Sequence, residues 1–248
     1  MGMFDALTTD GLEDSKDVLG GNFDPIPSNV YDGVIKVMYA GTSKSSDAQN
    51  VTVIFVTDGK EVRETLYVTN KAGQNFYPDK QDKTKKQPLP GFTLVDEICM
   101  FGTEKGLAAQ QTEEKMVNIW NNDERKEVPT PTEVLTDMTG KPMRLAILRQ
   151  IVDKQKKDAN GVYQNTGETR TENVIDKSMH IDTGRTINEY KHGVETSVFR
   201  DGWLKKNEGK DRPRAKGLTG AAGPGATGSG MPAGVSASPS KSLFGNKG

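Results

Sequence analysis

The sequence has one cysteine, Cys99, and two histidines, His180 and His192, among 248 residues. A single cysteine cannot form an intramolecular disulfide, which favours a reducing compartment. These residues are also too few for a Cys/His zinc site. No Walker A motif and no G-x-S-x-G nucleophile elbow is present, and no carboxylate cluster stands out as a metal site. We therefore expect no metal, no cofactor and no enzymatic activity.

Long apolar runs are missing as well. Hydrophobic residues make up 33% of the chain, and none of their runs approaches the roughly 18 residues of a membrane span. The first 21 residues lack the basic region and apolar core of a secretory signal. We expect no membrane association and a location in the cytoplasm.

Charge is distributed unevenly along the chain. From Lys205 to the end there are eight basic and two acidic residues, although the net charge of the whole chain is −1. Residues 217–248 consist mainly of glycine, alanine, proline and serine, which leave little to bury and predict disorder. Four parts are predicted: a flexible N-terminal arm at 1–28, a folded domain at 29–204, a basic linker at 205–216, and a disordered tail at 217–248.

The folded part reads mainly as strands. Alternation and turn signals predict strands at 30–43, 51–56, 61–70, 113–122, 143–155 and 173–182. Asp58-Gly59 is a typical hairpin turn. Helical spacing of Leu94, Val95 and Ile98 predicts a helix at 91–107. A proline-bearing connection is expected at 123–142, and one or two short helices at 187–207, with Trp203 packed against the body.

About five strands with a helix between the third and the fourth match the OB-fold pattern. The predicted fold class is therefore mainly β: an OB-fold-like five-stranded Greek-key barrel with an inserted helix, short C-terminal helices and a disordered tail.

The strand at 61–70 carries the clearest functional signal. Period two separates an inward set, Val62, Glu64, Leu66 and Val68, from an outward set, Arg63, Thr65, Tyr67, Thr69 and Lys71. The inward set is apolar except for Glu64. The outward set places an aromatic ring between two cations, which suits stacking of a base and neutralisation of the flanking phosphates.

A basic, aromatic-bearing loop at 70–92 follows that strand, and it is too polar to be buried. Alternatives stay open: a core position for Tyr67 or Trp120, a lid over a barrel end for Phe76 and Tyr77, and a solvated loop for the lysines. The predicted DNA-binding residues are Arg63, Tyr67, Lys71, Phe76, Tyr77, Lys80, Lys83, Lys85, Lys86, Trp120, Lys141 and Arg144.

Four stretches resemble single-stranded DNA-binding proteins of tailed bacteriophages: AGTSKSSDAQNVTVIFV, RETLYVTNKAGQNFYPDK, LPGFTLVDEICMF and the closing KSLFGNKG. The resemblance covers about residues 29–205 and the tail end. It implies an OB-fold that coats single-stranded DNA during phage replication and recombination in the cytoplasm of the bacterial host. It also implies that Tyr67, Phe76 and Tyr77 stack bases.

The tail departs from this family. Many proteins of this function end in an acidic tail, whereas this one is uncharged to basic. We predict that Lys241, Leu243, Phe244 and Lys247 form a docking segment for a replication, recombination or transcription protein. Two other functions remain open: an OB-fold protein-interaction or virion component, and a strand-annealing factor. The choice between DNA and RNA is also open, because contacts to the 2′-hydroxyl cannot be read from a sequence.

Overall fold

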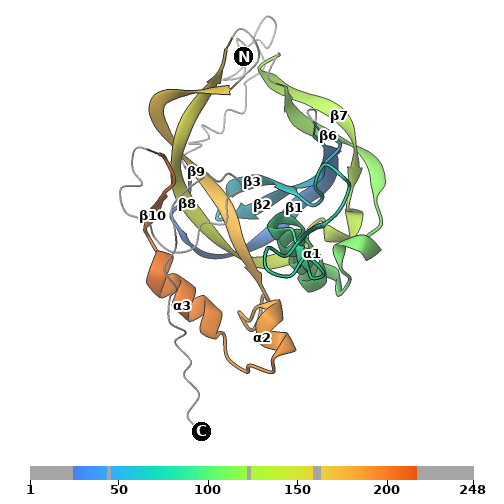
Figure 1. Cartoon of the computed structure of the whole chain (residues 1–248), viewed down its shortest axis with the longest axis vertical. Helices are drawn as coiled ribbons and strands as arrows, with labels where there is room; N and C mark the ends of the chain where they lie inside the picture. The colour runs from blue at the N-terminus through green and yellow to red at the C-terminus, as the bar shows by residue number, and fades with distance from the viewer. Residues whose placement is uncertain (1–24, 44–45, 122–123, 159–162, 217–248) are drawn as a thin grey trace, which may run out of the picture.

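The structure is a computed structural model that describes residues 25–43, 46–121, 124–158 and 163–216 (Figure 1). It is mainly β, as the sequence predicts, and its strand pairs are antiparallel with one exception. The main sheet contains β1 (Asn29–Thr42), β2 (Gln49–Thr57), β3 (Lys60–Tyr67), β6 (Glu113–Asn121), β7 (Lys126–Val134), β8 (Pro142–Lys157), β9 (Tyr163–Met179) and β10 (Asp211–Pro213). A small separate sheet pairs β4 (Phe76–Pro78) with β5 (Lys86–Pro88).

The main sheet follows the order β10-β8-β1-β2-β3, with β9 paired to β8, β7 to β1 and β6 to β7. Its eight strands exceed the five of the expected barrel: the predicted strand at 113–122 is present as β6, and β7 and β10 are not among the predicted strands. The sheet is not a closed barrel, since no ladder joins β3 to β9 within the described ranges. In Figure 1 the β6–β7 and β8–β9 hairpins extend on either side of β1, β2 and β3.

The core forms where the period-two pattern predicts it. Val51, Val53 and Phe55 of β2 are buried in the main apolar cluster, together with Val62 of β3. The turn at Asp58-Gly59 has φ angles of 48° and 73°, which confirms the predicted hairpin with two left-handed residues.

The predicted helix is α1 (Pro90–Thr103), and its buried side chains include Leu94, Val95 and Ile98 as expected. It ends four residues before the predicted limit. Glu104 adopts a left-handed conformation with a φ of 59°, and its N–H donates to the Met100 carbonyl. The short 3₁₀ turn η1 (Leu107–Ala109) follows.

The proline-bearing connection predicted at 123–142 is wrong in its middle, where β7 forms. Pro129 and Pro131 lie within this strand and pair with Asn118 and Met116 of β6. β7 pairs with β1 at a single residue, Val134, so most of its second edge needs no N–H donors. Prolines two residues apart are tolerated on such an edge. A 3₁₀ turn, η2 (Thr136–Met138), leads on toward β8.

The long strand favoured at 143–155 is confirmed as β8, and β9 begins ten residues earlier than expected. The predicted C-terminal helices are α2 (Ile187–Lys191) and α3 (Val198–Asn207). Trp203 is 6% exposed and packs with Ala146 and Leu148, as predicted for a structural tryptophan. Its indole N–H donates to the Asp176 carboxylate over 2.7 Å.

The folded part is longer at both ends than predicted. The segment expected as a basic linker holds the end of α3 and β10, which pairs in parallel with β8 and lies next to the buried Ala215. At the other end Ile26 is buried in the main cluster, and the Ser28 hydroxyl donates to the Lys210 carbonyl over 2.6 Å. The expected arm at 1–24 and the tail at 217–248, with Lys241, Leu243, Phe244 and Lys247, lie outside the described residues.

Cys99 lies on the buried side of α1. Burial, with a smaller effect of Asp96, raises the pKa of its thiol to about 12. We expect no reaction of the folded protein with a thiol-specific disulfide reagent at pH 8, and one equivalent of reaction after denaturation. Absorbance of the released thiolate measures both. Rapid labelling of the folded protein would show that α1 separates from the sheet.

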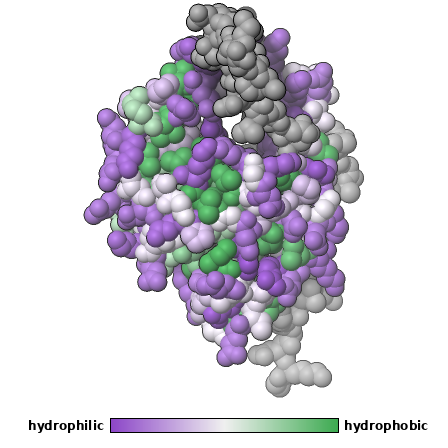
Figure 2. All heavy atoms as spheres, turned by 180° about the vertical axis from the view of Figure 1, so that it is seen from behind, coloured by the Kyte–Doolittle hydropathy of each residue, from purple (hydrophilic) through white to green (hydrophobic). Residues whose placement is uncertain are grey.

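The surface is mixed in character. Figure 2 shows one face, on which several groups of hydrophobic side chains are surrounded by hydrophilic ones. Among the described residues, no helix has both the length and the apolar character needed to cross a bilayer.

Candidate nucleic-acid interface

The predicted stripe lies on the outer face of β3. Arg63, Thr65 and Tyr67 alternate with the inward Val62 and Leu66, and Tyr67 is 52% exposed, so the alternative of a core tyrosine is wrong. The Thr65 hydroxyl lies 2.9 Å from the Thr52 hydroxyl of the neighbouring strand β2. A ring that is half exposed on a paired strand can stack a flat ligand without unfolding the sheet.

The backbone around Tyr67 is held firmly. Tyr67 pairs with Asn50 in the β2–β3 ladder, and the next residue, Val68, donates its N–H to the Gln49 carbonyl over 2.9 Å. The first turn of α1 packs closely against the Tyr67 backbone, because a Cβ placed on Gly91 would lie 2.3 Å from the Tyr67 carbonyl oxygen. Only glycine permits this approach, so the start of α1 lies directly against the end of β3.

A hollow of about 370 Å³ lies near the end of β3; Val68 is part of its lining and Tyr67 is not. Its lining includes Asn50, which pairs with Tyr67 across the ladder, and Val68, which follows Tyr67 in the chain. Leu107 of η1, Gln110 and Glu133 of β7 also line it. It is of a size that a small flat group can enter, and its walls combine apolar with polar side chains.

The β6–β7 hairpin, which carries Trp120, meets β3 through an ion pair. Arg63 Nη2 lies 3.6 Å from Glu127 Oε1 at the start of β7. Glu127 pairs directly with Trp120 across the hairpin. Residues paired in an antiparallel ladder project from the same face, so Trp120 and Glu127 share the exposed face of the hairpin, opposite the face through which Val117 and Ile119 pack on the sheet. Trp120 is 52% exposed, so the interpretation of it as a core residue is wrong.

The 70–92 loop is ordered around the β4–β5 pair. Phe76 and Tyr77 are consecutive in β4, so they project from opposite faces and cannot form one stacking surface. Phe76 is half-buried, and the Lys86 Nζ lies 4.3 Å from the centre of its ring. Tyr77 is 40% exposed and therefore the more accessible of the two rings.

The loop lysines are exposed, as predicted for Lys71, Lys80, Lys83, Lys85 and Lys86. Two carboxylates oppose them. The backbone N–H groups of Asp82 and Gln81 hold the pKa of Asp79 below its usual value, and the Thr84 hydroxyl does the same for Asp82. Asp82 also lies 3.6 Å from Lys85. The carboxylates of Asp79 and Asp82 thus accept hydrogen bonds that hold the loop backbone, while the lysine side chains are exposed to solvent.

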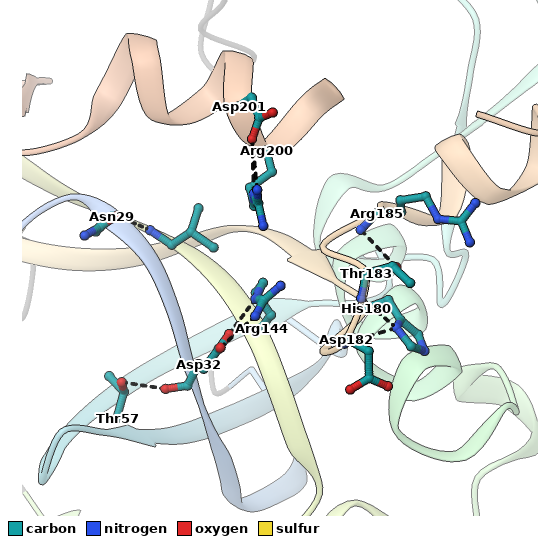
Figure 3. A network of polar contacts seen from close by, with 11 residues as sticks. Asn29, Asp32, Thr57, Arg144, His180, Asp182, Thr183, Arg185, Arg200 and Asp201 are labelled. Carbon is teal, nitrogen blue, oxygen red and sulfur yellow. Dashed lines mark hydrogen bonds and ion pairs between the residues drawn. The ribbon is translucent and has the colours of Figure 1, made fainter. Parts of the chain in front are cut away.

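Two predicted residues, Lys141 and Arg144, make contacts with other elements. Arg144 Nε and Nη2 donate to the Asp32 carboxylate over 2.5 and 2.7 Å, as Figure 3 shows. Arg144 lines a second hollow of about 460 Å³ with Arg200 of α3. Each of these arginines is held by an aspartate, Asp32 or Asp201, so this hollow carries both signs of charge. Lys141 lies on the segment before β8, where its backbone pairs with Ile35 of β1.

Glu64, the polar exception in the inward set, spans the gap in the sheet. Its carboxylate accepts a hydrogen bond from the Ile175 N–H of β9. Its pKa is raised to about 7: burial is the largest cause, the Ile175 hydrogen bond acts in the opposite direction, and the nearby Glu172 and Asp176 add to the rise. Glu64 therefore links β3 to β9 where no ladder does, and it keeps the strand that carries Tyr67 in position.

Sequence reasoning missed Glu127, which lies 64 positions from its partner Arg63. A signal was present. Val128, Thr130, Thr132 and Val134 alternate with exposed residues, which is the period of a strand with one covered face. The prolines concealed this pattern.

The comparisons give no relative: the chain matches no protein-family model, no curated protein and no solved structure.

Proposed function

We propose that the protein binds single-stranded DNA without sequence preference and without catalysis. The observation that carries this proposal is the half-exposed Tyr67 on the β3 face, with Arg63 on the same face and the Trp120-bearing hairpin joined to it. An aromatic ring stacks any base, and adjacent cations neutralise phosphates, which together bind a strand regardless of its sequence.

The strand order supports an OB-fold as the framework. We interpret the series β1-β2-β3, a gap bridged by Glu64, then β9-β8 and back to β1, as a partly open five-stranded Greek key with α1 between its third and fourth members. In this interpretation β6–β7 and β10 are additions. OB-folds bind oligonucleotides on the face of their second and third strands, and Tyr67 is exposed on the third strand of this series.

The biological setting rests on the sequence resemblance. We propose that the protein coats and protects single-stranded DNA in phage replication and recombination, in the cytoplasm of the bacterial host. The tail end, with Leu243 and Phe244, is proposed to recruit a partner protein.

The test is a fluorescence-anisotropy titration of the full chain with labelled oligonucleotides of about 20 nucleotides, single-stranded DNA, single-stranded RNA and duplex DNA, at about 50 and 200 mM salt. We expect binding to the single strands to exceed binding to the duplex, and affinity to fall at the higher salt because cation–phosphate contacts release counterions. Equal binding to duplex would contradict the proposal. If none of the oligonucleotides binds, a protein-interaction role is favoured. If the protein accelerates pairing of complementary strands, an annealing role is favoured.

A further inference from the structure

One acidic residue contacts the proposed binding surface. Glu127 reaches across from the β6–β7 hairpin to Arg63, the cation on the same face of β3 as Tyr67. The side chains of Arg63 and Glu127 are 35% and 52% exposed, so both are accessible to a ligand from solvent. Arg63 is thus held by a carboxylate at the position where a bound strand would need it for a phosphate.

A phosphate and this carboxylate compete for the same guanidinium. Arginine pairs with both through charge-assisted hydrogen bonds, and its planar donors suit phosphate geometry. The Arg63–Glu127 separation of 3.6 Å is longer than a direct hydrogen bond, and exposed ion pairs of this kind are weak. Replacing Glu127 by a phosphate as the partner of Arg63 therefore costs little free energy. A Glu127 carboxylate that stays in place repels the phosphates of the strand.

We propose that Glu127 is an affinity-determining residue of the DNA-binding surface. In the free protein its carboxylate holds the Arg63 guanidinium and ties the hairpin tip to β3. On binding, a backbone phosphate replaces it, and the Trp120-bearing tip is released from β3. This inference rests on the proposed function, because it names the contact that a strand must displace.

The experiment compares Glu127→Gln with Glu114→Gln by anisotropy titration with single-stranded oligo-dT. Glu114 is an exposed glutamate on the same hairpin and provides the same change of charge away from Arg63. We expect E127Q to bind about three- to fivefold more tightly than wild type, as loss of a weak ion-pair competitor implies. E114Q should show a smaller gain in affinity for oligo-dT.

A double-mutant cycle decides the mechanism. In an Arg63→Gln background, E127Q should give no gain, because the cation for which it competes is gone. A gain of equal size in E114Q, or one that persists without Arg63, would mean a general effect of net charge and would overturn the inference. Absence of single-strand binding by the wild type would instead overturn the proposed function, and this inference with it.

Discussion

Replacing Tyr67 with alanine should weaken binding of single-stranded oligo-dT by about 5- to 150-fold. Stacking of one base on an aromatic side chain contributes roughly 1–3 kcal/mol, which corresponds to that range. Tyr67 is 52% exposed, so its removal takes little from the core and the free energy of unfolding should change little. Anisotropy titration measures the affinity, and urea denaturation measures the stability.

Two further variants separate stacking from other effects. Tyr67→Phe keeps the ring and loses the hydroxyl, so it should retain nearly wild-type affinity. Phe199→Ala removes another exposed ring, from α3, and should leave the affinity unchanged. Unchanged affinity in Tyr67→Ala would refute the assignment of β3 as the binding face, even if the protein binds single strands elsewhere.

Replacing Glu64 with glutamine should stabilise the protein above pH 7 and have little effect near pH 4.5. The folded protein raises the pKa of Glu64 from 4.5 to about 7, so the fold disfavours the ionised carboxylate. Below pH 4.5, the pKa in the unfolded chain, Glu64 is protonated in both the folded and the unfolded state and does not change the free energy of unfolding. As the pH rises toward 7 the unfolded chain releases its proton first, and stability falls with pH. Above pH 7 the full cost is present, on the order of 3 kcal/mol.

Glutamine removes this cost because it is never charged, and its side-chain oxygen can still accept from the Ile175 N–H. Urea denaturation of wild type, E64Q and the exposed control E114Q at pH 4.5, 6 and 8 measures the effect. The stability gain of E64Q over wild type should grow across this series, and that of E114Q should not. An equal gain at all three values would show that Glu64 is solvated in the folded protein.

The strands and the main helix could be predicted because local patterns determine them. The alternation around Arg63, Thr65 and Tyr67 predicts an outward stripe, and the structure has it. The left-handed Asp58-Gly59 turn and the buried face of α1 follow equally from short-range signals.

The errors arose where a contact between distant segments decides the structure. Pro129 and Pro131 argue locally against a strand, yet an edge position accommodates them. Arg144 reads as a free cation until Asp32, 112 positions away, is placed beside it. The same holds for Glu64, whose partner on β9 no local pattern indicates.

The contact between Gly91 and the Tyr67 carbonyl has a consequence for the loop that connects β3 to α1. The chain leaves the sheet after Tyr67 and returns at Pro90 to nearly the same place, so the lysine-rich segment between them is an appendage with a fixed base. Its length and charge can change by insertion, deletion or replacement while the ring stays where it is. Variation in that appendage would tune how much of a strand the protein covers and would leave the stacking position untouched.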